Sequence, residues 1–93
     1  IALDFGKRQV LIADTELELT SAEFNVLAEL MQAAGSIVSK NDLTEKVLHR
    51  KLTAYDRAID VHVSRVRQKL AVMLPDSELI KTVRGAGYML VKA

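Results

Sequence analysis

The sequence has no cysteine and no tryptophan, and it contains only two phenylalanines, two tyrosines and one proline in 93 residues. Without cysteine the chain can form neither a disulfide framework nor a thiolate metal site. Hydrophobic residues still make up 49 % of the chain, so the core is expected to be aliphatic. No apolar run approaches the roughly 18 residues of a membrane-spanning helix, and no signal-peptide pattern is present. We therefore expect a soluble, cytoplasmic protein that does not bind membranes.

The length and the distribution of charge narrow the class of protein further. The 93 residues are enough for one compact domain, and a start at Ile1 without methionine suggests a fragment of a longer protein. Residues 1–39 carry two basic and six acidic side chains, a net charge of −4, whereas residues 40–93 carry eleven basic and six acidic side chains, a net charge of +5. The C-terminal half is therefore the part expected to face a polyanion.

The segment 56–70 is the most informative part of the chain. At roughly 100° per residue, its apolar residues form one narrow stripe of a helix. The stripe consists of Ile59, Val63, Val66 and Leu70. The opposite face carries Arg57, Val61, Ser64 and Gln68, with Arg65 at its edge, and no carboxylate. Such groups contact base edges and phosphates in a DNA major groove. The alternative is a solvated amphipathic helix with incidental arginines.

The end of the chain predicts a β-hairpin. Two β-rich runs, residues 79–83 and 88–91, flank Arg84-Gly85-Ala86-Gly87, and glycine accepts the positive φ angles that tight turns require. A nucleotide-binding glycine loop would need a following helix, whereas a strand follows here. A basic-faced helix followed by a hairpin with Arg84 at its tip is typical of a winged helix.

Upstream of these elements the pattern is of short strands and capped helices. Residues 1–4, 9–13 and 17–19 predict a small antiparallel meander. Thr20 and Glu23 form a capping box that begins a helix, which Gly35 ends as its C′ residue. Residues 37–38 are extended, and residues 39–42 form a second cap before a short helix. A third cap at residues 53–56 begins the long helix, expected from about residue 54 to residue 72. Pro75 forbids much continuation.

This order of elements predicts an α+β fold. We expect a single domain over residues 1–93, a winged helix-turn-helix with a three-helix core, an N-terminal antiparallel sheet and a C-terminal β-hairpin wing. The two histidines, His49 and His62, lie in different elements without the carboxylate spacing of a metal cage, and no nucleophile sits in a recognisable elbow. We therefore expect no enzyme activity, no cofactor and no metal. A protein-interaction module is the main alternative to a DNA-binding domain, because a fold does not determine a function.

Four motifs in order resemble the OmpR/PhoB family of response-regulator effector domains. They are Leu19-Thr20-x-x-Glu23-Phe24-x-x-Leu27, Gly35-x-Ile37-Val38-Ser39-x-x-Asp42-Leu43, Arg57-x-Ile59-Asp60-Val61-His62-Val63-x-x-Val66-Arg67-x-Lys69-Leu70 and Ile80-x-Thr82-Val83-Arg84-Gly85-x-Gly87-Tyr88. Within the family, residues 51–60 resemble the branch that regulates envelope-stress genes. The chain departs from the family in three ways: it lacks one N-terminal strand, it has no tryptophan near Leu48, and it has Ser64 where many members have a basic residue.

The resemblance implies sequence-specific binding of promoter DNA by the output domain of a two-component regulator. It also implies tandem pairs on direct repeats, RNA polymerase as a partner, and a sensor kinase acting through a receiver domain that this chain lacks. The loop of His49, Arg50 and Lys51 would contact the polymerase.

By the same resemblance, individual residues receive expected roles. The residues expected to contact phosphates are Arg57, His62 and Arg67. The residues expected nearest the base edges are Val61, Ser64 and Arg65, with Gln68 on the same face. Periodicity, however, places His62 and Arg67 on the flanks of the apolar stripe, and a packed, hydrogen-bonded histidine is the alternative role of His62. Asp60 is expected to orient a neighbouring arginine, with a solvated carboxylate as its alternative. In the hairpin, Arg84 would enter a narrow minor groove. Thr82 and Tyr88 would contact phosphates, with capping of the core as the alternative for Tyr88.

Overall fold

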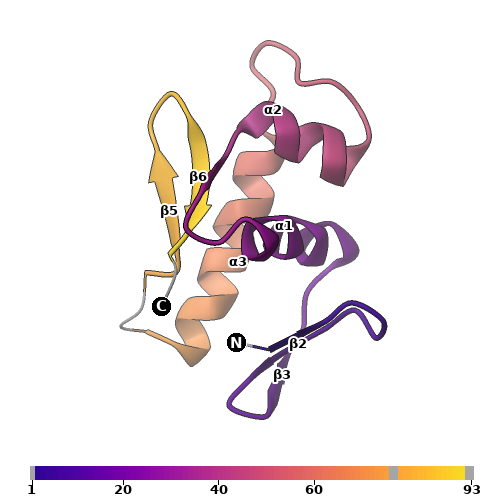
Figure 1. Ribbon diagram of the computed structural model, residues 1–93, viewed down its shortest axis with the longest axis vertical. Helices are drawn as coiled ribbons and strands as arrows, with labels where there is room; N and C mark the ends of the chain where they lie inside the picture. The colour runs from indigo at the N-terminus through magenta and orange to yellow at the C-terminus, as the bar shows by residue number, and fades with distance from the viewer. Residues whose placement is uncertain (1, 76–77, 92–93) are drawn as a thin grey trace.

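The computed structural model describes residues 2–75 and 78–91 and has the predicted α+β winged-helix architecture (Figure 1). Three helical segments, α1 (Ser21–Gln32), α2 (Lys40–Leu43) continued by η1 (Thr44–Leu48), and α3 (Ala58–Met73), lie between two antiparallel sheets. The first sheet has the order β1 (Ala2–Asp4), β2 (Gln9–Ile12), β3 (Thr15–Leu17). The second has the order β4 (Ile37–Val38), β6 (Gly87–Leu90), β5 (Ile80–Val83). Ile1, the first residue of the predicted meander, lies outside the described residues.

The N-terminal sheet is the predicted meander with its third strand shifted. Ala13 and Asp14 join β2 to β3 and both have positive φ, 49° and 65°, as in the two-residue turns that match the twist of a hairpin. This short turn pairs Thr15 with Ile12. The third strand therefore begins at Thr15 and ends at Leu17, in place of the predicted residues 17–19, and Leu19 leads into the next helix.

Helix α1 begins at the predicted capping box. The Thr20 hydroxyl accepts a hydrogen bond from the Glu23 amide at 3.2 Å, and the Glu23 carboxylate accepts one from the Thr20 amide at 3.0 Å. The helix ends at Gln32 with Ala33 as its C-cap. Gly35, with φ of 85°, therefore lies one position beyond the predicted C′, a shift within the usual variation of helix ends.

The core lies between α1 and the apolar stripe of α3. All four predicted stripe residues are buried, and they pack with aliphatic residues of α1, α2 and η1. Buried aliphatic partners include Val26, Leu27, Leu30, Leu43 and Val47. Phe24 and Tyr88 are the buried aromatic residues of the described chain, so the expectation of a mainly aliphatic core is confirmed.

The second cap is confirmed, because the Ser39 hydroxyl accepts a hydrogen bond from the Asp42 amide at 3.0 Å. Helix α2 continues as the wider turn η1 and ends where His49 adopts φ of 57°.

The third predicted cap is wrong in position. Helix α3 begins at Ala58, four residues later than predicted, because residues 53–56 form a turn in which the Asp56 amide bonds to the Thr53 carbonyl at 3.2 Å. The Asp56 carboxylate, and not Thr53, accepts a hydrogen bond from the helix, at 3.1 Å from the Ala58 amide. The helix ends at Met73, one residue beyond the predicted end.

The C-terminal hairpin, hereafter the wing, consists of β5, β6 and the turn between them. Gly85 in this turn has φ of 72°. A Cβ atom on Gly87 would come within 2.1 Å of the Val38 carbonyl oxygen, so only glycine lets β6 approach the end of β4. Figure 1 shows the tip of the wing at the same end of the molecule as the α2–α3 connection, with β1–β3 at the opposite end.

Candidate nucleic-acid interface

The outward face of α3 is formed by the predicted residues. All five are exposed in the structure: Arg57, Val61, Ser64, Arg65 and Gln68. Asp60 is the one carboxylate among the residues of α3, and it does not belong to this face. The exposed face can therefore offer guanidinium donors, an amide, a hydroxyl and a small apolar group without a carboxylate of α3 among them.

His62 lies on the flank of this face. It is half-buried, and its Nδ1 atom is buried with no hydrogen-bond partner in the described part of the chain. The half-burial agrees with the packing expected in the alternative role of His62, whereas the hydrogen bond expected of Nδ1 in that role is absent from the described residues.

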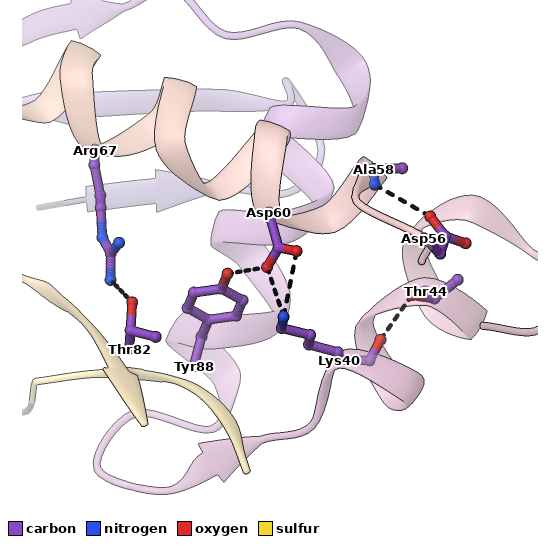
Figure 2. A network of polar contacts seen from close by, with 8 residues as sticks. All are labelled: Lys40, Thr44, Asp56, Ala58, Asp60, Arg67, Thr82 and Tyr88. Carbon is purple, nitrogen blue, oxygen red and sulfur yellow. Dashed lines mark hydrogen bonds and ion pairs between the residues drawn. The ribbon is translucent and has the colours of Figure 1, made fainter. Parts of the chain in front are cut away.

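Arg67 also flanks the exposed face, and its guanidinium is directed toward the wing. Nε and one terminal nitrogen donate to the Ile80 carbonyl at 3.2 and 3.0 Å, and that terminal nitrogen also donates to the Thr82 hydroxyl at 2.6 Å. Figure 2 shows Arg67 reaching from α3 to Thr82 on β5. The expectation that Arg67 serves mainly as a phosphate contact is therefore replaced by a role in holding the wing.

Tyr88 is likewise engaged inside the protein. The residue is only 5 % exposed, and its hydroxyl donates to Asp60 Oδ1. The structure therefore supports the alternative in which Tyr88 caps the core, and it corrects the expectation of a phosphate contact. Burial and the adjacent Asp60 carboxylate together raise the pKa of Tyr88 to about 12, which keeps the hydroxyl a donor.

Asp60 was expected to orient a neighbouring arginine. In the structure its hydrogen-bond and ion-pair partners are instead Tyr88 and Lys40. The Lys40 ammonium lies 3.0 Å from Oδ1 and 3.3 Å from Oδ2 (Figure 2). Burial alone would raise the pKa of Asp60, but the bonds from Tyr88 and Lys40 outweigh it and hold the pKa below the usual value. The carboxylate is therefore charged at neutral pH.

Arg84 stands at the tip of the wing, as predicted. It is exposed, and it lies in the turn directly after β5. A cleft runs between the wing and the beginning of α2, with Lys40 and Arg84 among its lining residues. Thr82 is exposed as well; its oxygen accepts from Arg67, which leaves the hydroxyl hydrogen available to another acceptor.

The loop between η1 and α3 has the exposed basic residues that the sequence predicted, His49, Arg50 and Lys51. Arg50 is not a free cation, however, because its guanidinium forms a two-nitrogen ion pair with Asp56. The hydrogen bond from Arg50, aided by the Ala58 amide, lowers the pKa of Asp56 to about 2. The loop is thus tied to the first turn of α3.

Sequence reasoning missed Lys40 and Asp56 as members of this surface. Asp56 carried a usable signal, since aspartate is itself among the preferred residues at the start of a helix. Lys40 carried none, because its partner Asp60 is 20 residues away in the sequence.

No group of histidine, cysteine and acidic residues within residues 2–75 and 78–91 is suited to hold a metal ion. The same residues contain no helix that combines the length and the apolar character needed to cross a membrane.

The packed helices, with an exposed basic face on the last of them and a wing beside it, define a winged helix-turn-helix domain. The chain belongs to the family described as "Transcriptional regulatory protein, C terminal", whose model matches residues 14–90. The resemblance to OmpR/PhoB-type effector domains is therefore confirmed.

Relatives and solved structures support the same assignment. The chain is 40 % identical over its full length to the transcriptional regulatory protein CpxR of Escherichia coli K12, and it spans 40 % of that protein. The branch of the family that residues 51–60 resemble is that of CpxR, so this finer resemblance is confirmed as well. The crystal structure of the E. coli CpxR DNA-binding domain matches with a TM-score of 0.90 at 40 % identity, covering 98 % of this chain and 89 % of that one.

A second structure is the DNA-binding domain of RstA from Klebsiella pneumoniae in complex with the RstA box. It matches with a TM-score of 0.86 at 34 % identity, and the match covers 96 % of this chain and 88 % of that chain.

Proposed function

We propose that this chain binds promoter DNA sequence-specifically, as the output domain of a two-component response regulator. Helix α3 would lie in the major groove and Arg84 of the wing in the neighbouring minor groove. The observation that carries the proposal is the exposed face of α3 with its N-cap residue Arg57. Together they hold two exposed arginines, Arg57 and Arg65, and no carboxylate, beside an arginine-tipped wing. The RstA domain, 34 % identical to this chain, has been solved in complex with the RstA box, which supports DNA binding by this chain.

Within this proposal the exposed residues divide by chemistry. Arg65 is the candidate for guanine, because a guanidinium can donate two hydrogen bonds to its O6 and N7 atoms. Val61 and Ser64 lie on the same face and would contact neighbouring base edges, with Gln68 one turn further along the helix. Arg57, at the start of α3, would contact a phosphate, as would the Thr82 hydroxyl.

Three predicted phosphate contacts, His62, Arg67 and Tyr88, are half-buried or buried in the structure. His62 would contact a phosphate from the flank of the exposed face. Arg67 and Tyr88 are left out of the contact surface, because their polar groups bond to Ile80, Thr82 and Asp60.

The larger regulator would work as the family resemblance implies. Two copies would bind direct repeats in tandem in the cytoplasm, a sensor kinase would act through a receiver domain, and RNA polymerase would contact the loop of His49 and Lys51. The chain spans about two fifths of the length of CpxR, so these statements concern segments and partners beyond it.

The first test is the salt dependence of DNA binding by the 93-residue chain. Contacts to about six phosphates predict that log K falls with log salt concentration with a slope of about −5. Selection from a random DNA library would then supply the preferred site. A flat salt dependence, or a selected pool without a common sequence, would contradict the proposal.

The second candidate function is a protein-interaction module. The observation that favours it is Tyr55, which is 97 % exposed at φ of 63° in the loop before α3. An aromatic ring held outward in a loop is typical of a protein contact. Binding to RNA polymerase with no binding to DNA would favour this second function.

A further inference from the structure

Three elements of the proposed DNA surface meet at one carboxylate. Asp60, in the first turn of α3, accepts from Tyr88 of β6 and pairs with Lys40 of α2 (Figure 2). The Asp60 side chain is 23 % exposed, so these interactions are only partly screened by water.

Two helical turns further along α3, Arg67 contacts the same tyrosine. Its guanidinium carbon lies 5.6 Å from the centre of the Tyr88 ring, while its nitrogens bond to Ile80 and Thr82 of β5. We call Asp60, Arg67, Thr82 and Tyr88 the polar seam. The seam joins α3 to both strands of the wing.

A polar seam has a consequence that apolar packing would not have. Apolar contact, such as that of the buried Ile80 and Leu90, is non-directional. Hydrogen bonds, in contrast, weaken steeply when their angles depart from linear. The seam therefore restricts the angle at which the wing leaves α3, as well as joining the two.

We propose that Asp60 is a positioning residue, which holds the wing at the angle where Arg84 enters the minor groove while Arg65 lies in the major groove. The inference rests on the proposed function and adds a specificity role for a residue that does not itself contact DNA. Arg84 depends on this angle because it lies at the tip, beyond the strands that the seam holds.

The test compares binding to one core site flanked by A·T pairs or by G·C pairs. Arg84→Ala should reduce the preference for A·T flanks by about five- to tenfold, the effect of a single base-pair contact. Asp60→Ala and Tyr88→Phe should each reduce it by about threefold or more, since each removes the bond between α3 and β6. Preference for bases within the core site should be retained.

Electrostatics alone predicts a different result. Loss of the Asp60 charge would strengthen binding to all DNA sequences alike and would leave the flank preference unchanged. Tyr88→Phe changes no charge, and it removes only the hydroxyl, so it also serves as the variant least disturbing to folding.

A double variant and a matched control complete the experiment. The double variant combines Tyr88→Phe with Arg84→Ala. If the two positions acted independently, their effects on flank preference would multiply to within about twofold. We expect instead that Arg84→Ala has little further effect on flank preference once Tyr88 is replaced. Glu29→Ala removes another helical carboxylate that pairs with a lysine, Lys46 at 3.8 Å, and it should leave the preference unchanged.

The outcomes separate the two proposals. If the unaltered chain binds with steep salt dependence and Arg84→Ala lowers the preference, but Tyr88→Phe does not, the role of Asp60 is overturned and the proposed function stands. The role of Asp60 would also be overturned if the fold-changes of the two single variants multiplied in the double variant. If the unaltered chain does not bind DNA, or Arg84→Ala leaves the flank preference intact, the wing contact fails and the inference fails with it.

Discussion

The two sheets of this molecule are attached to the helices by similar contacts but present different surfaces. At the sheet β1–β3, Arg8 lies over the ring of Phe24 in α1, with its guanidinium carbon 4.5 Å from the ring centre. At the second sheet, Arg67 of α3 lies over the ring of Tyr88 in β6. Each sheet is thus joined to a helix by an arginine on an aromatic ring, a contact that combines cation–π attraction with hydrogen bonds.

The difference lies in which charges remain unpaired on each side. Arg8 donates to the Ser21 and Asn25 side chains, and its sheet carries Asp4 at the end of β1 and Asp14 in the β2–β3 turn. Residues 79–91, which contain the wing, carry Lys81 and Arg84 and no carboxylate. The same kind of contact therefore only attaches the sheet β1–β3 to α1 at one end of the molecule. At the other end it attaches the wing to α3, which by our proposal serves DNA binding.

The largest expected effect is on stability and concerns α1, which carries the first sheet. Glu23 is only 1 % exposed, and Lys69 of α3 pairs with it at 2.5 Å. Lys69→Ala leaves this carboxylate without its counter-ion and should lower the free energy of unfolding by about 3 kcal/mol, at the low end for a buried pair because Lys69 is 38 % exposed.

Urea denaturation would measure this effect, with Lys46→Ala as the control. Lys46 pairs with Glu29 at 3.8 Å on the surface, and its loss should cost less than about 1 kcal/mol. Equal losses for the two variants would contradict a special role of the Glu23–Lys69 pair.

The next effect is on base recognition by α3. Arg65→Ala should weaken binding to the best site by ~1–3 kcal/mol and relax the preference at one or two positions, because one bidentate contact is lost. Titration against a panel of single-base variants would measure it. A uniform weakening across the whole panel would show that Arg65 contacts a phosphate.

A smaller effect compares the two sheets directly. Arg84→Ala should leave the free energy of unfolding within about 0.5 kcal/mol of its original value, weaken DNA binding, and flatten the preference for A·T flanks. Arg8→Ala should do the reverse: it should cost about 1 kcal/mol of stability, through lost cation–π and hydrogen-bonding contacts, with DNA affinity unchanged.

Thermal denaturation and DNA titration of both variants would provide the comparison. Unchanged affinity of Arg84→Ala for A·T-flanked DNA would show that the wing does not reach the groove. A loss of affinity in Arg8→Ala would show that the two ends of the molecule are coupled.

The smallest effect on DNA binding is expected in the loop before α3. Arg50→Ala with Lys51→Ala should reduce transcription more than DNA binding, as expected of a polymerase contact. The ion pair between Arg50 and Asp56 allows the two residues to be separated. Lys51→Ala alone should affect transcription only, whereas Arg50→Ala should also weaken DNA binding slightly by loosening the start of α3.

Parallel binding and transcription assays would distinguish the two residues. Equal losses of binding and transcription in Lys51→Ala would remove the case for a polymerase contact.

The sequence alone was sufficient for the parts of this protein that local rules control. The periodicity of Ile59, Val63, Val66 and Leu70 identified the buried stripe of α3, since helical geometry assigns neighbouring residues to faces. The capping box at Thr20 marked a helix start, and the two glycines after Arg84 marked a hairpin, for the same reason. The exposed face followed as the complement of the stripe.

Tertiary structure decided which of the polar residues are committed within the protein. Tyr88 and Asp60 are 28 residues apart in the sequence, and Glu23 and Lys69 are 46 apart. Periodicity gives the face of a residue but not the element that packs against it. It placed Arg67 on the flank of the apolar stripe, the family resemblance placed it at a phosphate, and the structure directs its guanidinium to the wing. The start of α3 shifted to Ala58 because Arg50 holds Asp56 in the preceding turn. Side chains with several possible partners take the partner that packing of distant segments brings near, and local sequence contains no measure of that distance.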